Sequence, residues 1–184
     1  SSATSNLLVS DFGNNAVRLI DASSNVSSLS PPDPYNYSTQ LVVAGPITLS
    51  NPQTLSLYSN SLYTVLNSGG TSAIARIPLT TYPTTTFTFS NLRYTDVPYT
   101  NGVVGSNDGP LSTATFRMTD VCGLCVDSNT NTMYVGDSGN FVIRKISNGI
   151  VTTIAGNGSN AHVDNSIGSN ASFNDITTLT INST

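Results

Sequence analysis

A pattern of apolar strand segments repeats along this chain, and an internal repeat constrains a fold more than any other sequence feature. In each segment two apolar residues are separated by one residue, which places one face of a strand in a core. The segments are residues 52–59, 121–128 and 176–183. Their apolar positions coincide at Leu55, Leu124 and Leu179, and again at Leu57, Val126 and Ile181. The chain is therefore predicted to be built from repeated strand units.

Further strands follow each first strand in a constant order. Second strands are predicted at residues 7–11, 62–65 and 133–137. Third strands, each with a Gly/Asn-rich start and a basic residue near the end, are predicted at residues 13–20, 69–77 and 139–146. Fourth strands are predicted at residues 42–45, 103–105 and 153–156. Gly and Asn tolerate the positive φ that tight hairpins require, so each unit is predicted to be an antiparallel sheet, with residues 22–39 and 79–100 as insertions or long loops.

The two ends of the chain are complementary. Residues 176–181 are predicted to be a first strand without a second strand, and residues 7–11 are predicted to be a second strand without a first strand. Joined tail to head, they complete one unit. The end strand is expected to pair with another copy, with chain outside this sequence, or with the chain's own other end. An unpaired strand edge is otherwise an aggregation liability.

The unit at residues 121–156 resembles the NHL-repeat family. The matching stretches are residues 123–127, 133–140, 142–146 and 151–156. The linker that follows contains Asp164, Gly168, Ala171 and Phe173, which resembles the stretch between blades in that family, and residues 105–116 repeat this linker. The resemblance implies four-stranded antiparallel blades arranged around an axis.

The expected fold class is therefore all-β, with β-propeller-type blades of four antiparallel strands and about three blades in a permuted frame. Residues 1–184 are expected to be a single NHL-like propeller domain or fragment. Its blades are approximately residues 176–184 plus 1–45, residues 52–105 and residues 121–156. Closed propellers have about four to eight blades. The chain is accordingly expected to be an excerpt of a longer propeller, half of a two-chain ring, or a subunit of a head-to-tail assembly.

Charge excludes one class of partner. Charged residues make up 9% of the 184 residues, and the net charge is −4 with only six basic residues. Nucleic-acid binding requires clustered Lys and Arg that neutralise phosphates, so no nucleic-acid partner is expected. The chain also lacks a run of 18 apolar residues, and no membrane span is predicted from it.

Asn-x-Ser/Thr sequons are frequent, which is typical of a secreted or cell-surface glycoprotein. The candidate N-glycosylation sites are Asn25, Asn36, Asn157, Asn170 and Asn182. Glycans at these sites would supply the solubility that few charges provide. The chain does not begin with Met, and it is interpreted as processed or excerpted from a longer protein. The predicted location is extracellular or at the cell surface.

Two cysteines stand in a Cys-x-x-Cys spacing, at Cys122 and Cys125. Redox or zinc chemistry at such a pair needs a thioredoxin-like setting or a second pair of ligands, and His162 is the only His. No metal is predicted here. The pair is interpreted as two small buried residues or as a local disulfide. A disulfide would need a bend near Gly123, because residues three apart on a strand point to opposite faces.

Asp residues occur in two further patterns. Residues 127–131 imitate the start of a calcium loop, but Ser138 stands where the bidentate Glu is required, and a hairpin turn is predicted instead. An Asp and an Arg recur seven residues apart. These two pairs are Asp11 with Arg18 and Asp137 with Arg144. Ion pairs across adjacent strands, or Asp side chains that bind turn amides, are the expected role.

Catalysis is not predicted. Some NHL propellers are enzymes, including a zinc-dependent amidating lyase, whose chemistry requires several His ligands. This chain has a single His, no evident pair of catalytic carboxylates, and no Gly-x-Ser-x-Gly nucleophile elbow. No catalytic residue and no cofactor are therefore assigned.

The function predicted from the sequence is that of an extracellular glycosylated structural protein. It is expected to be a subunit of a cell-surface fibre or appendage, built by head-to-tail blade complementation between copies. The alternative is a propeller binding module of a larger secreted receptor or adhesin, with its ligand on the loops of one face. Self-association distinguishes the two.

Overall fold

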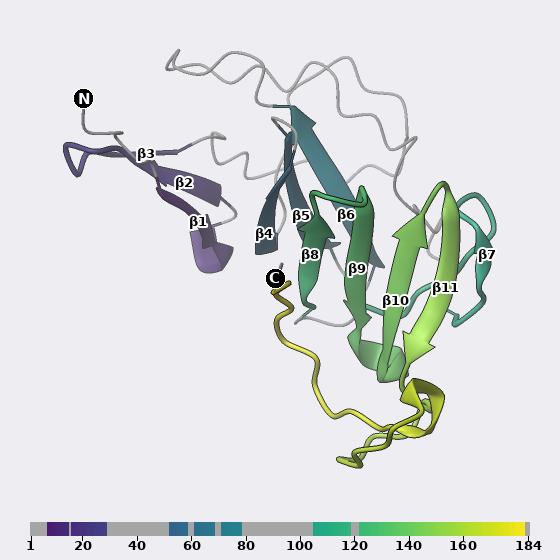
Figure 1. Cartoon of the computed structure of the whole chain (residues 1–184). Coiled ribbons are helices and arrows are strands. Elements are labelled where there is room, and N and C mark those ends of the chain that lie inside the picture. The colour runs from purple at the N-terminus through teal and green to yellow at the C-terminus, as the bar shows by residue number, and fades with distance from the viewer. Residues whose placement is uncertain are drawn as a thin grey trace.

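The structure is a computed structural model that describes residues 7–14, 16–28, 52–58, 61–68, 71–78, 105–118 and 122–182. These residues form three antiparallel sheets (Figure 1). The helical elements among them are short 3-10 turns: η1 (Phe12–Asn14), η3 (Ser138–Asn140) and η4 (Gly168–Asn170). The predicted all-β fold class is confirmed.

The first sheet has the strand order β1-β2-β3. Its strands are β1 (Leu7–Asp11), β2 (Ala16–Ile20) and β3 (Val26–Ser28). Strands β1 and β2 are the second and third strands predicted for this unit, and the fourth strand predicted at residues 42–45 lies outside the described residues.

Strand β3 corrects one expectation, because it lies within residues 22–39, which were predicted to be an insertion or loop. The side chain of Asp21 accepts hydrogen bonds from the backbone N–H groups of Ser23 at 2.8 Å and Asn25 at 2.9 Å. This turn folds the chain back, so that Val26 lies opposite Ile20 on β2. Turn geometry of this kind depends on one Asp side chain and leaves a weak pattern in the sequence.

The second sheet has the order β4-β5-β6. Its strands are β4 (Pro52–Tyr58), β5 (Ser61–Ser68) and β6 (Thr71–Pro78). Two tight hairpins connect them, with Tyr58 paired to Ser61 and Ser68 paired to Thr71. These are the first three predicted strands of the unit. Of the fourth predicted strand, residues 103–105, only Gly105 is described, and it is not in a strand.

The third sheet has five strands in the order β7-β11-β10-β9-β8. They are β7 (Gly109–Pro110), β8 (Leu124–Asp127), β9 (Thr132–Asp137), β10 (Val142–Ser147) and β11 (Ile150–Ala155). Strands β8 to β11 are the four strands predicted for this unit. The short β7 was not predicted. It comes from the preceding linker, residues 105–118, and pairs with the start of β11.

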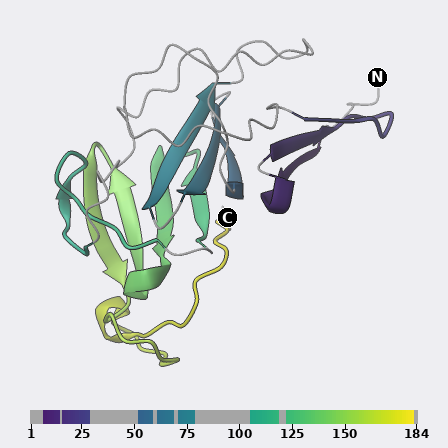
Figure 2. The ribbon, with the colours of Figure 1, turned by 180° about the vertical axis from the view of Figure 1, so that it is seen from behind.

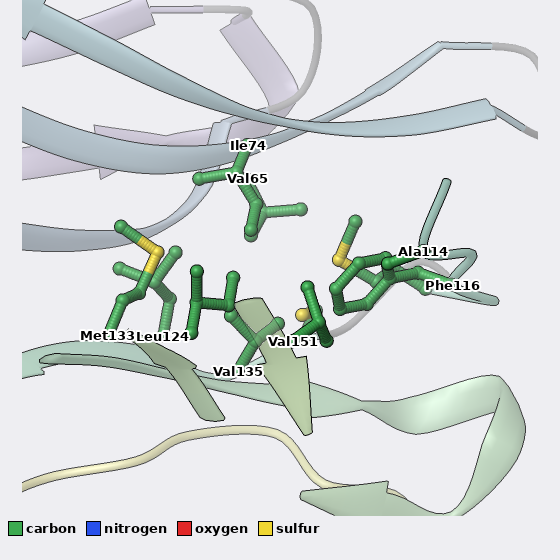
Figure 3. Close-up of a cluster of buried hydrophobic side chains, with 11 residues drawn as sticks. Val65, Ile74, Ala114, Phe116, Leu124, Met133, Val135 and Val151 are labelled. Atoms are coloured by element: carbon green, nitrogen blue, oxygen red, sulfur yellow. The ribbon is translucent and has the colours of Figure 1, made fainter. Parts of the chain in front are cut away.

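The second sheet lies between the other two (Figures 1 and 2). Val65 on β5 and Ile74 on β6 point into a core shared with the third sheet, opposite Leu124, Val135 and Val151 (Figure 3). Leu62 and Thr64, on the opposite face of β5, are also buried. Strand β5 is thus buried on both faces.

The chain after β11 forms a second linker, residues 156–175, and a tail, residues 176–182, which is not in a strand. The tail lies against the third sheet. The N–H of Gly123 donates to the carbonyl of Ile176 at 3.3 Å, and a Cβ at Gly123 would lie 2.8 Å from the backbone N of Leu179. The first strand predicted at residues 176–181 is therefore not formed in the single chain. A strand needs a neighbour that satisfies its backbone groups, and these residues run beside the sheet rather than within a ladder.

Candidate functional site

The candidate site is a three-residue polar unit that occurs twice in the structure. In the third sheet it consists of Asp137, Asn140 and Arg144, which we call the covered site. In the first sheet it consists of Asp11, Asn14 and Arg18, which we call the open site. In both sheets the Asp ends one strand, the Asn lies in the following 3-10 turn, and the Arg lies on the next strand. The spacing along the chain and the strand register are the same.

The covered site is a buried ion pair in which several groups bind the carboxylate and the guanidinium, while Arg144 Nε is buried without a hydrogen-bond partner. Nη1 of Arg144 donates to Oδ2 of Asp137 at 2.8 Å, and both side chains are inaccessible to solvent. Asn140 Nδ2 donates to the same carboxylate at 2.8 Å, and the backbone N–H of Arg117 donates to its other oxygen at 2.8 Å. Charge-assisted hydrogen bonds of this kind are what makes a buried charge tolerable.

The linker of residues 105–118 covers this site. Arg144 donates to the carbonyl of Asn107 at 2.8 Å and to the carbonyl of Thr115 at 3.1 Å, and it pairs with the carboxylate of Asp108 at 2.9 Å. The ring of Phe116 lies under the guanidinium, 4.6 Å from ring centroid to Cζ. The linker therefore binds the Arg144 side chain through one carboxylate, two carbonyl oxygens and one aromatic face.

Burial raises the pKa of the Asp137 carboxyl above its usual value, and the hydrogen bonds from Asn140, the Arg117 amide and Arg144 limit the rise. The linker is the element that produces this dry environment. The covered site is thus a structural ion pair, and the raised pKa of Asp137 depends on the linker that shields it from solvent.

The open site has the same internal contacts without that cover. Arg18 Nη1 pairs with Asp11 Oδ2 at 3.2 Å, and Asn14 Nδ2 donates to Asp11 Oδ1 at 2.9 Å. The Arg18 and Asp11 side chains are 35% and 27% exposed. Within the described part of the chain, no segment lies over Arg18 as residues 105–118 lie over Arg144.

The strand beside the open site is also uncovered. In the third sheet β8 pairs along the edge of β9. Met133 and Val135 are 8% and 0% exposed because they lie in the core shared with the second sheet. The equivalent residues on β1, counted back from the Asp, are Leu7 and Val9, which are 59% and 36% exposed. Among the described residues, β1 pairs with β2 alone. Within the described residues, the first sheet therefore has neither the linker nor the first strand that complete the third sheet.

The sequence predicted part of this arrangement. The two expected roles were ion pairs across adjacent strands or Asp side chains that bind turn amides, and the ion pair is formed at both positions. The structure adds that the pair of Asp137 and Arg144 is fully buried. The contributions of Asn14, Asn140 and Asp108 were missed. A signal existed for the Asn residues, because Asn stands three residues after the Asp in both units.

The cysteines are free thiols in the structure. Cys122 is buried and its Sγ lies 2.9 Å from the carbonyl oxygen of Gly136. Burial, with the negative charge of Asp137, raises the pKa of the Cys122 thiol. Cys125 lies on β8 and is half-buried, and burial also raises its pKa. High thiol pKa values disfavour nucleophilic or metal chemistry.

The remaining predicted positions are at the surface. The side chains of Asn25, Asn157, Asn170 and Asn182 are exposed, and Asn36 lies outside the described residues. His162 is exposed in the second linker. Asp127 accepts hydrogen bonds from the Asn129 N–H at 2.9 Å and the Thr130 hydroxyl at 2.6 Å, which is the predicted hairpin turn. In the described ranges no three His, Cys, Asp or Glu residues come together as a metal site.

None of the helices in the described residues is long and apolar enough to cross a bilayer.

Two linker segments in this chain share one backbone hydrogen-bond pattern. In the first linker the N–H of Gly105 donates to the carbonyl of Phe116, and the N–H of Thr115 donates to the carbonyl of Asn107. In the second linker the N–H of Ala161 donates to the carbonyl of Phe173, and the N–H of Ser172 donates to the carbonyl of Val163. The pattern makes Asn107 equivalent to Val163, and the next residues, Asp108 and Asp164, equivalent to each other. The first linker covers an Asp–Asn–Arg site, and the second linker covers none among the described residues.

No protein-family model matches the chain, and no curated protein matches it. Solved structures do match. A structural genomics protein of unknown function from Bacteroides thetaiotaomicron is 19% identical with a TM-score of 0.64, over 94% of this chain and 38% of that chain. An auxiliary nutrient binding protein from the same organism is 17% identical with a TM-score of 0.55, over 94% of this chain and 39% of that chain. At these identities the likeness concerns the fold alone. The chain spans less than two fifths of the length of either structure.

Proposed function

We propose that the three sheets are blades of an NHL-like β-propeller and that the chain is a glycosylated structural protein of the cell exterior. In this proposal it is a subunit of a surface fibre or appendage whose copies associate head to tail. One observation carries the proposal: the edge of β9 is covered by a first strand and a linker, while the equivalent edge of β1 is uncovered among the described residues.

The exposed edge of β1 supports this proposal physically. Leu7 and Val9 are apolar and exposed on a strand that pairs with β2 alone among the described residues. Natural proteins usually cover a strand edge of this kind. Strand addition by a second chain supplies backbone hydrogen bonds and apolar contacts together. Because the donated tail and the accepting edge are different surfaces, the contact is heterologous and generates a ring or a filament.

The surface chemistry supports an extracellular setting. The four described sequon Asn residues are exposed, so each is accessible to glycan transfer, and the chain has few charges to provide solubility in their absence. Intact-mass measurement of the native protein before and after peptide N-glycosidase treatment tests this part of the proposal. Unchanged mass would contradict it.

Association is tested by sedimentation velocity over a concentration series, with negative-stain electron microscopy of the same samples. We expect oligomers or filaments in the unmodified protein and their loss in Leu7→Lys, because a charge at the β1 edge opposes strand addition. Ile150→Lys is the matched control: Ile150 is also an exposed apolar strand residue, on β11. A chain that stays monomeric at every concentration, or a control variant that loses association equally, would refute the proposal.

A binding module of a larger secreted protein is the second candidate. It is favoured by the likeness to the auxiliary nutrient binding protein. It is also favoured by the fact that this chain covers only 39% of that structure. In that case the β1 edge is completed by further residues of the same chain, and purified full-length protein forms closed single particles.

A further inference from the structure

We propose that the open site is occupied by residues 161–181 of a second copy of this chain, with Asp164 of that copy forming an ion pair with Arg18. The inference rests on the proposed head-to-tail association and specifies the contacts that carry it. Its basis is that the chain already forms this contact within itself, at the covered site, and contains a second linker with the same two backbone hydrogen bonds.

The covered site defines what an occupant must supply. Arg144 receives one carboxylate from Asp108, two carbonyl oxygens from Asn107 and Thr115, and the face of Phe116. Asn140 Nδ2 donates to the carbonyl of Gly105 at 2.8 Å. The backbone N–H one residue after Phe116 completes the Asp137 carboxylate. Every one of these groups except the carboxylate and the ring is a backbone atom, so the linker's backbone shape largely determines the fit.

The second linker presents the same groups in the same order. By the shared hydrogen-bond pattern, Val163 and Ser172 stand for Asn107 and Thr115, and Phe173 stands for Phe116. Asp164 then stands for Asp108, with its side chain exposed. Docked on the open site, this linker brings the Asp164 carboxylate, the carbonyls of Val163 and Ser172, and the Phe173 ring to Arg18.

The remaining contacts follow from the same equivalence. Asn14 Nδ2 donates to the carbonyl of Ala161, as Asn140 donates to that of Gly105. The backbone N–H of Asn174 donates to Asp11, as the Arg117 N–H donates to Asp137. Each group of the open site that is half-exposed in the single chain thereby acquires the partner that its buried counterpart already has.

The tail extends the contact along the β1 edge. On the third sheet Leu124 pairs with Val135 and Val126 pairs with Met133. The aligned tail residues are Leu179 and Ile181, so the proposed register places Leu179 opposite Val9 and Ile181 opposite Leu7. These two contacts cover apolar side chains that are otherwise exposed.

The tail already lies where a following first strand belongs. Strand β8 packs beside β4, the first strand of the preceding sheet, and the Val126 N–H donates to Ser56 Oγ at 3.1 Å. The tail in turn passes beside the start of β8, on Gly123. In Figure 1 its described part runs toward the lower ends of β4 and β8. A second copy bound to the tail would extend the row of sheets in the same direction.

Cysteine cross-linking tests the register. In a Cys125→Ser background, which removes the half-buried thiol, full-length Val9→Cys protein is mixed with full-length Leu179→Cys protein under a mild oxidant. We expect a disulfide-linked heterodimer that forms in the mixture and in neither protein alone. Thr180→Cys mixed with Val9→Cys is the matched control, because position 180 is adjacent along the tail and faces the other side of the strand.

The ionic contact is tested by the association constant. Charge-assisted hydrogen bonds that become buried contribute to the free energy of association. Asp164→Asn is therefore expected to weaken association roughly tenfold to a hundredfold. Asp127→Asn, which removes an exposed carboxylate at the β8–β9 hairpin, is expected to leave association unchanged.

The outcomes separate the two proposals. Association that persists without a Val9–Leu179 cross-link, and with an unchanged constant for Asp164→Asn, overturns this inference and leaves head-to-tail association standing. Absence of association in the unmodified protein overturns both. A cross-link inside single chains of the Val9→Cys/Leu179→Cys double variant shows that the chain closes on itself, and it also overturns both.

Discussion

At the scale of single residues, two Asp–Arg pairs of identical chemistry differ in their exposure to solvent. Asp137 and Arg144 are inaccessible to solvent, whereas Asp11 and Arg18 keep about a third of their side-chain surface in water. A buried pair is costly to break because removal of one partner leaves an uncompensated charge in a dry site. An exposed pair is screened by water and contributes little.

This contrast predicts unequal effects of the same substitution. Arg144→Met is expected to lower the free energy of unfolding by about 3–5 kcal/mol, because it leaves Asp137 buried without its cation. Arg18→Met is expected to cost at most about 1 kcal/mol in the monomer. Urea denaturation of both variants, at dilutions where the chain is monomeric, measures the difference. Equal losses in the two variants would show that the linker does not create the buried environment described above.

At the scale of elements, hairpin turns are held by single Asp side chains. Asp127 organises the β8–β9 turn, and Asp21 organises the β2–β3 turn with Asn25 and Ser23. Hydrogen bonds to the charged form hold the pKa of both carboxyls below the ordinary value of 3.8, with the Thr130 hydroxyl and the Asn25 side chain as the largest causes.

The pKa shifts give a pH prediction with a definite sign. A carboxyl whose pKa is lower in the folded state stabilises the fold above its unfolded pKa of 3.8, and the stabilisation is lost as the pH falls through the lower folded value. Both turns are therefore expected to loosen on acidification below about pH 4. Amide hydrogen exchange at Asn129 and Asn25, followed by NMR, measures this loosening.

Asp127→Asn supplies the internal control for that experiment. The variant is expected to abolish the pH dependence of the protection factor at Asn129, which is the intrinsic exchange rate divided by the observed rate at the same pH. It is expected to keep that dependence at Asn25, because only the first turn loses its titrating group. Pronounced acid sensitivity at Asn129 in this variant would assign the effect to another carboxyl.

The strands also show which features of the fold the local sequence does not predict. Strands β8 to β11 were predicted in order because each is joined to the next by a short hairpin, so pairing is decided within a few residues. Strand β7 was not predicted, because it pairs with β11 across a long separation in the chain. Residues 176–181 have a strand pattern and form no strand, since the pattern describes which face is apolar and says nothing of whether a partner is present.

At the scale of the whole molecule, the second sheet lies in the middle of the stack, and the first sheet lies at one end of it. The core joins β5 and β6 to the third sheet through Val65, Ile74 and the residues opposite them. The first sheet packs on the other side, with β1 beside β4 and a hydrogen bond from Ser10 Oγ to the Gln53 carbonyl at 3.1 Å. It therefore gains the most from any segment that completes it.

Completion by a second copy predicts a stability that depends on concentration. Binding that favours the folded state raises the unfolding midpoint by mass action. The thermal midpoint of the unmodified protein is expected to rise as its concentration increases, whereas that of Leu7→Lys is expected to stay constant. Differential scanning fluorimetry over a hundredfold concentration range measures both. A midpoint independent of concentration in the unmodified protein would contradict completion by association.

The amino-acid sequence was sufficient to predict the all-β class and the order of the hairpin strands, and it indicated ion pairs of Asp11 with Arg18 and of Asp137 with Arg144 as one of two possible roles. These features depend on alternation with a period of two and on short turns, and both are local properties of the chain. The tertiary structure was needed to show that one ion pair is buried and the other half-exposed, and which backbone hydrogen bonds the two similar linkers share. Burial and shape arise from segments far apart in the chain, and no local pattern specifies which segments those will be.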